Sequence, residues 1–411
     1  LNPKTLDMNY TKLAWRNIWR NRRRTLITIS SVFFALLLAI LMRGLQLGTY
    51  DQMIKNSVEQ YGGYVQIHKD GYQDEQILNN AFMPNDSLKE AVLAHENVKD
   101  LLPRLQTYSL ASSEMQTKGA IIIGLDADKD DKLTKVKEKL IKGRMPESGG
   151  KSVVLAEELA NYLKLGIGDT AVFIGQGYHG ISASGLYPVV GIISYPVPQL
   201  NNRLVYMDIK TTQEYLSIGN GLTAWIVRLK DQDQYKETTR ELKSIIPDDY
   251  EVMHWETMQP GVKQGIEADN KSGLIILMIL YIVIAFGIFG TVLMMIAERR
   301  KEFSIMVAVG MQKTRLAKLV TTETLMIVAL GIVSAVFVSI PFIWYLHLNP
   351  LTFSGEIAHM FAEYGMEPIM PVAFEPGYFL GQTGVVLILT LIAVAWPLLS
   401  IFKLDVTKSI R

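Results

Sequence analysis

The apolar residues of this chain are gathered into four long runs. They are Thr25 to Met42, Leu274 to Ala297, roughly Leu325 to Leu346 and roughly Tyr378 to Phe402. Each run has about 18 or more residues with almost no charge, enough to cross a hydrocarbon core about 30 Å thick at about 1.5 Å per residue. We therefore predict four transmembrane helices rather than four buried helices of a soluble core.

The segments that flank these runs differ in their basic content. Residues 1–24 hold seven Lys and Arg, residues 298–324 hold six, and residues 347–377 hold none. Because Lys and Arg accumulate on the cytoplasmic side, we expect both termini and the 298–324 loop in the cytoplasm, and 347–377 and 48–272 outside. The first run is longer than a typical signal-peptide core and no small-x-small cleavage site follows it, so we interpret it as an anchor.

The long outer segment mixes strand and helix patterns. Alternating or short apolar stretches predict strands near residues 64–68, 120–123, 152–155, 169–174, 188–193, 204–207 and 225–229. Helices are expected from Asp86 to about His95, from Ala156 to Leu163 and from Gln234 to Ile246. The predicted fold is an α-helical membrane protein with four transmembrane helices and a large extracytoplasmic α+β domain between helices 1 and 2. We expect that domain to have two subdomains, one inserted in the other.

Composition narrows the possible functions. The 411 residues are 49% hydrophobic and 20% charged, with a formal net charge of +1 and no cysteine. A near-neutral chain is a poor match for nucleic acid, and absent cysteine excludes disulfides and thiolate catalysis. The six histidines form no ligand-spaced cluster, and Met145 to Ser152 only approximates a phosphate-binding loop. We expect no catalytic residue, no metal and no cofactor on this chain.

The spans offer no chemistry for driving transport by themselves. They carry Ser, Thr, Gln382 and Pro, but no Asp, Glu, Lys or His near mid-membrane, where ion-coupled carriers have such groups. Energy would therefore come from a partner. In residues 298–318 charges alternate with apolar residues, which predicts a short amphipathic helix on or below the membrane. The alternative is a plain connecting loop with solvated charges.

These loop residues resemble a known motif. Glu298 to Met311 is similar to the coupling-helix motif of MacB/FtsX-like ABC transporter permeases, with Ser304 where that motif usually has Gly. Leu13 to Arg22 resembles the N-terminal amphipathic segment of these permeases. Ser152 to Thr170 resembles their periplasmic core, and Trp396-Pro397 with Leu404 to Arg411 resembles their closing pattern. The order of helix, outer domain and three helices is the more specific part of the resemblance.

The resemblance implies a mechanism in which the permease passes ATP-driven motion of cytoplasmic ATPases to its outer domain. The chain has no complete Walker A motif, so ATP and Mg would be bound by a separate ABC ATPase dimer. Coupling to that ATPase would use Glu298, Arg299, Glu302, Phe303, Met306, Ala308, Gly310 and Met311. We expect Glu302 to pair with a basic group of the ATPase. A second permease subunit, identical or homologous, is also implied.

A chain of this length without a fused ATPase resembles the lipoprotein-releasing, LolC/LolE-like permeases of the inner membrane. The expected substrate is lipid-anchored or amphiphilic, with a periplasmic acceptor as a further partner. We expect it to enter along Leu38, Leu41, Met42, Leu45, Leu274, Ile275, Leu277 and Met278. An ordinary lipid-facing role for these residues remains an alternative. So do a macrolide- or peptide-type efflux permease, and a non-transporting regulator of cell-wall hydrolases.

The predicted boundaries follow from these patterns. They are a cytoplasmic amphipathic segment at 8–24, spans at 25–47, 273–297, 322–346 and 378–402, the extracytoplasmic domain at 48–272, the coupling helix at 298–318, an outer loop at 347–377 and a cytoplasmic tail at 403–411.

Overall fold

The computed structural model describes residues 10–20, 22–195, 197–363 and 368–402. The chain forms two compact units. The helical unit contains the described residues up to Tyr50, Glu267–Leu351 and those from Met370 onward. The mixed unit contains Asp51–Ile266 and Thr352–Ile369. Residues 1–9 and 403–411, and with them most of the closing pattern, lie outside the described residues.

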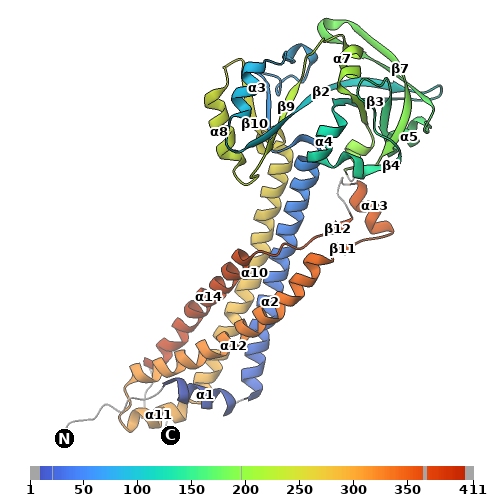
Figure 1. Cartoon of the computed structure of the whole chain (residues 1–411). Helices are drawn as coiled ribbons and strands as arrows, with labels where there is room; N and C mark the ends of the chain where they lie inside the picture. The colour runs from blue at the N-terminus through green and yellow to red at the C-terminus, as the bar shows by residue number, and fades with distance from the viewer. Residues whose placement is uncertain (1–9, 21, 196, 364–367, 403–411) are drawn as a thin grey trace. The chain divides into compact units, whose positions relative to one another are not determined.

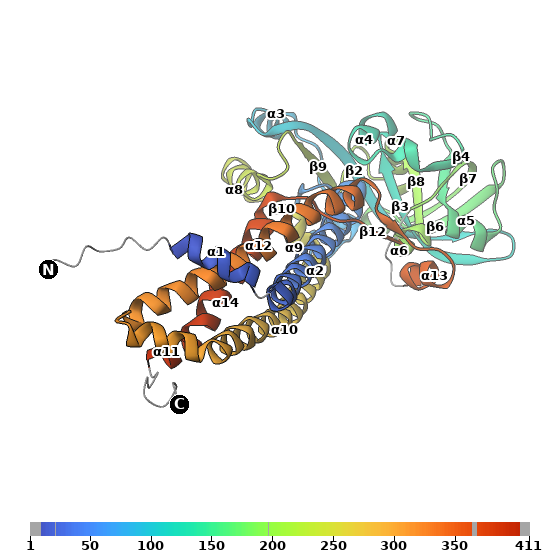
Figure 2. The same ribbon diagram turned by 90° about the horizontal axis from the view of Figure 1, so that it is seen from below.

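Each of the four apolar runs lies in one long helix. These are α2 (Arg22–Ile54), α10 (Pro260–Glu298), α12 (Lys313–Leu348) and α14 (Pro376–Phe402), all long and apolar enough to cross a membrane. α2 and α10 run side by side (Figures 1 and 2). Both continue past the predicted spans, α2 to Ile54 and α10 back to Pro260. A short amphipathic helix, α1 (Tyr10–Arg20), packs on α12.

Small residues bring the long helices close together. A Cβ on Gly331 of α12 would lie 2.8 Å from the Val32 Cβ of α2, so only glycine fits at that crossing. Ala335 and Ser339, one and two turns on, are fully buried. Gly331, Ala335 and Ser339 thus form a packing face of small residues on α12. One apolar cluster continues through α2, α10, α12 and α14.

The mixed unit is built on a ten-stranded sheet. The strands follow the order β10-β1-β9-β2-β3-β8-β5-β7-β4, and β6 pairs with β2 and β7. Their bounds are β1 Val65–Lys69, β2 Val98–Ser112, β3 Thr117–Leu125, β4 Leu140–Gly143, β5 Val153–Ala156, β6 Thr170–Gln176, β7 Ser182–Ile193, β8 Leu204–Asp208, β9 Ala224–Leu229 and β10 Tyr250–His254. All seven strands expected from the sequence are present; β2, β4 and β10 were not among them.

Short helices complete the mixed unit. They are the π-helix η1 (Lys55–Gly62), α3 (Asp86–Leu93), α4 (Ala127–Thr134), α5 (Glu157–Leu163), α6 (Pro198–Asn201), α7 (Ile209–Leu216), α8 (Tyr235–Ile245), α9 (Trp255–Met258) and α13 (Glu356–Glu363), with 3-10 turns η2 (Leu78–Asn80), η3 (Val136–Lys139) and η4 (Tyr178–Gly180). The three helices predicted for this segment correspond to α3, α5 and α8. Residues 347–377, expected as a loop, also contain the two-residue strands β11 (Leu351–Thr352) and β12 (Ile369–Met370).

β2 is the strand that joins two regions of the sheet. Its first half, Val98 to Arg104, pairs with β9, and its second half, Leu105 to Ser112, pairs with β3. One apolar cluster gathers residues 65–101 with residues 222–252. The clusters on the other side draw almost entirely on residues 105–218.

Candidate functional site

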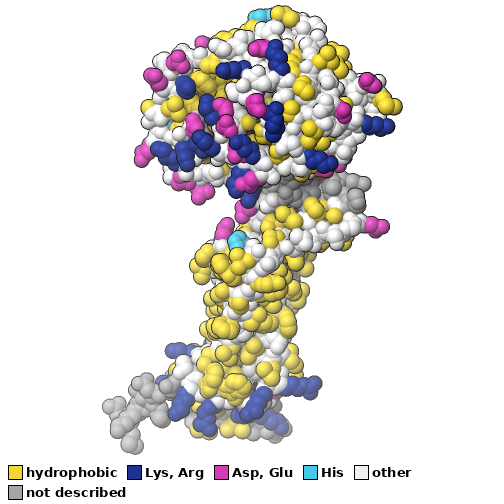
Figure 3. All heavy atoms as spheres, turned by 45° about the vertical axis from the view of Figure 1, so that its right-hand side comes forward, with side chains coloured by type: hydrophobic (Ala, Val, Ile, Leu, Met, Phe, Trp, Pro, Cys, Tyr) yellow, Lys and Arg dark blue, Asp and Glu magenta, His cyan; other side chains and the backbone are white. Residues whose placement is uncertain are grey.

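The predicted coupling segment is a helix–turn–helix at one end of the helical unit. α10 ends at Glu298, a second short helix, α11, occupies Arg300–Ala308, and α12 begins at Lys313. The turn back into α12 needs Gly310, whose φ of +105° is unfavourable for any residue with a side chain. In Figure 1, α11 and α1 both lie at this end, and Figure 3 shows Lys and Arg side chains gathered there below an apolar band.

A buried ion pair holds α11 to α12. The Arg299 Nη1 atom donates to Glu323 Oε2 at 2.9 Å, and both side chains are almost fully buried. Arg299 also donates from Nε to Glu302 at 3.0 Å and stacks over the Phe303 ring at 5.0 Å. The other Glu323 oxygen, Oε1, accepts no hydrogen bond from a described residue and lies 4.0 Å from Arg24.

Two further arginines tie the first helices to the same place. Arg24 of α2 donates to Glu298 at 2.7 Å, and Arg20 of α1 contacts both Glu302 oxygens at 2.7 and 3.0 Å. The hydrogen bond from Arg20 lowers the pKa of Glu302, and the bond from Arg299 adds to this. We call this set the ion network: Arg20, Arg24, Glu298, Arg299, Glu302 and Glu323. It joins α1, α2, α10, α11 and α12.

The expected coupling residues do not share one exposed surface. Phe303 is fully buried in the helical core, and Met306 and Met311 are partly buried against it. Arg299 is buried, and the described partners of Glu302 are arginines of this same chain. Of the expected set, Glu298, Glu302, Ala308 and Gly310 are exposed.

Two exposed apolar residues outside the expected set lie on α11 and at the position that directly follows it. Ile305 is 55% exposed and Val309 is 84% exposed. With Ala308 they form what we call the apolar tip. Both belong to the apolar alternation noted in the 298–318 segment, and their spacing of four residues places them on one helix face. Ser304, where the motif usually has Gly, is fully buried, and its hydroxyl has no hydrogen-bond partner among the described residues.

The expected substrate-path residues divide in the same way. Leu38 on α2 and Leu274, Ile275 and Met278 on α10 are exposed. Leu41, Met42 and Leu45 are partly buried, and Leu41 and Leu45 pack on the helical core. Leu277 is buried and faces inward, because α10 turns it away from its neighbours in the sequence. The residues therefore do not form one continuous outer face.

The phosphate-loop-like segment from Met145 to Ser152 is an ordinary turn. The Gly149 N–H donates to the carboxylate of Asp208 at 2.9 Å, and Gly149 adopts a positive φ of +71°. An acidic side chain thus occupies the position where a phosphate would need donors. Among the residues that the structure describes, no three His, Asp or Glu side chains gather as a metal site.

Comparisons with known proteins agree with this architecture. A model of the MacB-like periplasmic core domain matches residues 25–245, and one of the FtsX-like permease C-terminal matches residues 274–406. A comparison with curated proteins found no match.

Two solved structures resemble part of the chain. One is the periplasmic region of MacB from Actinobacillus actinomycetemcomitans, at 15% identity over 51% of this chain and 95% of that chain, with a TM-score of 0.35. The other is the extracellular domain of the noncanonic ABC-type transporter YknZ from Gram-positive bacteria, at 14% identity over 47% and 100%, with a TM-score of 0.33. Because the core-domain match alone spans more than half of the residues and the permease match follows it in order, the chain belongs to the family of MacB/FtsX-like ABC transporter permeases.

Proposed function

We propose that this chain is the permease subunit of a mechanotransmitting ABC transporter, and that it releases lipoproteins from the inner membrane. A separate ATPase dimer binds ATP and Mg and hydrolyses the ATP. Its motion enters the permease at α11, and the extracytoplasmic mixed unit responds. The observation that carries the proposal is the ion network beside the exposed apolar tip.

The ion network supports a rigid connection. A buried guanidinium–carboxylate pair with additional hydrogen bonds has one favourable geometry, because breaking it leaves an unpaired buried charge. Arg299 and Glu323 therefore hold α11 at a fixed angle to α12. Arg20 and Arg24 extend the connection to α1 and α2. A force on α11 would reach both helices that continue into the mixed unit, α2 and α10.

The apolar tip supports a docking role. Ile305, Ala308 and Val309 together leave apolar surface in water, with Val309 84% exposed, whereas a cleft on a partner would bury that surface. We assign the main ATPase contact to Ile305, Ala308 and Val309. Glu302 is already bound by two arginines of this chain. We therefore keep it only as a contact at the edge of the ATPase interface.

We also propose an orientation of the permease in the membrane and its assembly with a second subunit. Both termini and α11 lie in the cytoplasm, which the basic content of 298–324 supports. Two permease subunits, identical or homologous, pair over the ATPase dimer. The mixed unit consists of two subdomains, one inserted in the other; the apolar cluster that joins residues 65–101 with residues 222–252 supports this division.

The substrate is proposed to enter along α2 and α10. The exposed apolar positions Leu38, Leu274, Ile275 and Met278 support a lipid-compatible path. Photo-crosslinkers at Leu38 and Met278 should trap a lipoprotein in cells with an active ATPase. If they trap only phospholipid, these residues are ordinary lipid-facing positions, and efflux becomes the better description of the transporter.

The coupling role is tested by charging the apolar tip. Ile305→Asp and Val309→Asp should each lower recovery of the co-purified ATPase at least about tenfold, equivalent to about 1.4 kcal/mol. The matched control is Ile167→Asp, since Ile167 is 50% exposed but lies in the mixed unit. The control should retain the ATPase. Normal ATPase recovery with both tip variants, at normal membrane levels, would remove the basis for the proposal.

A further inference from the structure

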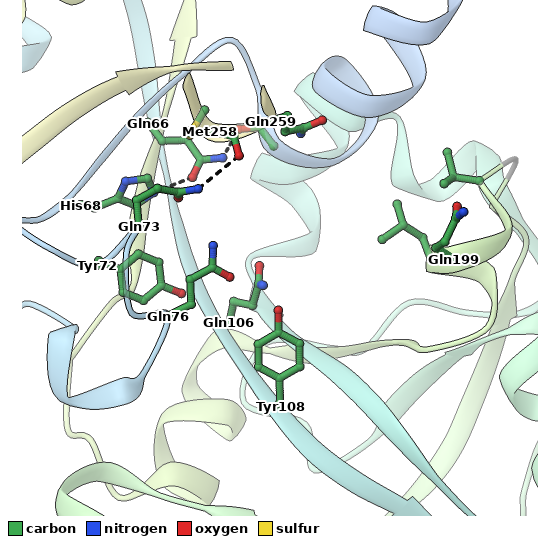
Figure 4. Close-up of a pocket in the computed structure, with 13 residues that line it drawn as sticks. Gln66, His68, Tyr72, Gln73, Gln76, Gln106, Tyr108, Gln199, Met258 and Gln259 are labelled. Carbon is green, nitrogen blue, oxygen red and sulfur yellow. Dashed lines mark hydrogen bonds between the residues drawn. The ribbon is translucent and has the colours of Figure 1, made fainter. Parts of the chain in front are cut away.

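A polar hollow of about 350 Å³ opens in the mixed unit, within the size range of ligand pockets. Six glutamines line it: Gln66, Gln73, Gln76, Gln106, Gln199 and Gln259. Figure 4 shows these side chains on different sides of the space, with His68, Tyr72 and Tyr108 beside them. We call it the glutamine hollow.

No described residue that lines the glutamine hollow is charged at neutral pH. Burial lowers the pKa of His68 from 6.5 to about 4, so its ring is neutral. Its Nε2 atom is hydrogen-bonded to Gln66 Oε1 at 2.8 Å. The Nδ1 atom has no hydrogen-bond partner among the described residues and lies 3.9 Å from Glu251. A charged ligand would lose hydration here without gaining a counter-charge. The chemistry therefore suits an uncharged occupant.

The glutamine amides match the groups of a peptide backbone. Each of these glutamine side chains carries two N–H donors and one carbonyl acceptor, and Gln66 already uses its carbonyl on His68. Two of them are held in place by the main chain: Gln66 donates to the Gly62 carbonyl at 2.5 Å and Gln73 donates to the Met258 carbonyl at 3.1 Å. A ligand with alternating N–H and C=O groups would find complementary partners in this arrangement.

The hollow continues along one face of β2. A second space of about 210 Å³ shares Gln76 and Tyr108 with the first, and a third of about 480 Å³ shares Tyr108 with the second. Gln106, Tyr108 and Leu110 follow one another on the same side of the strand because side chains alternate. The third space is mainly apolar, with Leu110 and Ile174 each about half exposed, and the exposed Arg203 also lines it. This elongated track fits an extended chain better than a compact ligand.

We propose that this track binds an extended, uncharged polypeptide segment, with its polar part in the glutamine hollow and an apolar part near Leu110. The inference rests on the proposed function, because a lipid-anchored protein necessarily presents a connecting chain segment next to its anchor. The track would recognise that segment rather than the lipid.

The position of the hollow in the chain links its occupant to the long helices. Gly62 ends η1, which directly follows α2, and Gln259 directly precedes α10. A Cβ on Gly62 would lie 3.0 Å from the Gln66 amide nitrogen and 3.7 Å from that of Gln259, so the end of η1 lies close to the residue that precedes α10. Movement of either helix therefore changes the geometry of the glutamine hollow, and with it the affinity for the segment.

The test measures peptide binding to the full chain in lipid nanodiscs without an ATPase. The probe is a capped, fluorescent peptide of about nine residues, made of Ser, Gly, Asn and Gln followed by Leu and Val. Binding is followed by fluorescence anisotropy. Tyr108→Ala and Gln76→Ala change exposed residues and should each weaken binding at least about tenfold. Gln232→Ala, an exposed glutamine elsewhere in the mixed unit, should leave binding unchanged.

Charged peptides and a neutral oligosaccharide test which kind of molecule the track binds. The same peptide with Lys or Glu in its polar part, which would lie in the glutamine hollow, should bind at least about tenfold more weakly, because no described residue that lines that hollow is charged. Absence of binding by the uncharged peptide, equal binding of the charged one, or displacement by a neutral oligosaccharide would each overturn the proposal. Since the assay contains no ATPase, a failure of peptide binding would not bear on the coupling role of α11. That role is tested separately by Ile305→Asp and Val309→Asp.

Discussion

Arg299 and Glu323 are opposite charges facing each other almost without solvent. Their side chains are 6% and 1% exposed, at an N–O distance of 2.9 Å. A charge in such a place is tolerated only while it is paired, and its loss costs far more than an exposed pair contributes. This pair therefore differs from Arg20 with Glu302, whose side chains are about half exposed.

The first prediction concerns this pair. Glu323→Gln removes the buried negative partner and leaves the buried Arg299 guanidinium with only the half-exposed carboxylate of Glu302. We expect the free energy of unfolding to fall by about 3–5 kcal/mol, seen as a lower melting temperature in detergent. Arg20→Gln, at the exposed pair, should cost less than about 1 kcal/mol. Similar losses for the two variants would mean that Glu323 is solvated in the membrane-bound protein.

His68 makes the stability of the mixed unit depend on pH. Its pKa is about 4 when folded and ordinarily 6.5, so the unfolded chain binds more protons between these values. The free energy of unfolding therefore keeps its full value above pH 6.5. It falls as the pH drops toward 4, by up to about 3 kcal/mol. Burial raises the pKa of nearby Glu251, which acts in the opposite sense.

The measurement that isolates His68 is a comparison of melting curves for the wild-type chain and His68→Gln. Between pH 7 and pH 4 the wild type should lose more stability than the variant, which cannot take up the proton. Parallel curves would show that the ring is already charged or exposed in solution.

At the scale of elements, the long helices were predictable and their packing was less so. About 20 apolar residues without charge have few alternatives, so the four runs identified α2, α10, α12 and α14. β2 was missed because Pro103 interrupts its pattern and proline is unusual inside a sheet. In the structure Pro103 nevertheless lies opposite Trp225 of β9.

The candidate site was predictable in place but not in detail. The 298–318 segment was identified, yet the side-chain directions on α11 depend on how it packs. Phe303 is buried and Val309 exposed, although both are apolar and six residues apart. The ion network could not be inferred, because Arg24 and Glu298 lie 274 positions apart and each resembles an ordinary membrane-flanking charge. No sequence spacing connects the six glutamines of the hollow either.

Two glycines of α2 provide an element-scale prediction. Gly44 accepts a hydrogen bond from Ala373, and a Cβ on Gly48 would lie 2.3 Å from the Pro371 carbonyl oxygen. Gly48→Ala should therefore push the 371–373 segment away from α2 and destabilise the helical unit by about 1–3 kcal/mol. Gly384→Ala is the control, since nothing lies within 4 Å of its Cβ position. The control should be neutral or slightly stabilising because alanine favours helix. Equal melting temperatures for both variants would argue against this contact.

At the scale of the whole molecule, the proposed coupling requires that α11 and the mixed unit lie on opposite sides of the membrane. The chain has no cysteine, so a single introduced cysteine is the only one in it that a maleimide can label. Ser354→Cys should react with a membrane-impermeant maleimide in spheroplasts, whereas Gln312→Cys should react only after permeabilisation. Both residues are exposed in the structure. The opposite labelling pattern would reverse the orientation and remove the basis for ATPase docking at α11.

We propose that ATP-driven motion at α11 changes the position of the mixed unit, a coupling between the two units. Its most direct test is a distance measurement between spin labels at Lys271→Cys in the helical unit and Lys142→Cys in the mixed unit, both exposed positions. The labelled permease is assembled with its ATPase in nanodiscs and compared with and without trapped nucleotide. We expect a shifted distance distribution in the trapped complex, and loss of the shift when Val309→Asp disrupts docking. An unchanged distribution in a complex that hydrolyses ATP and releases substrate would contradict it.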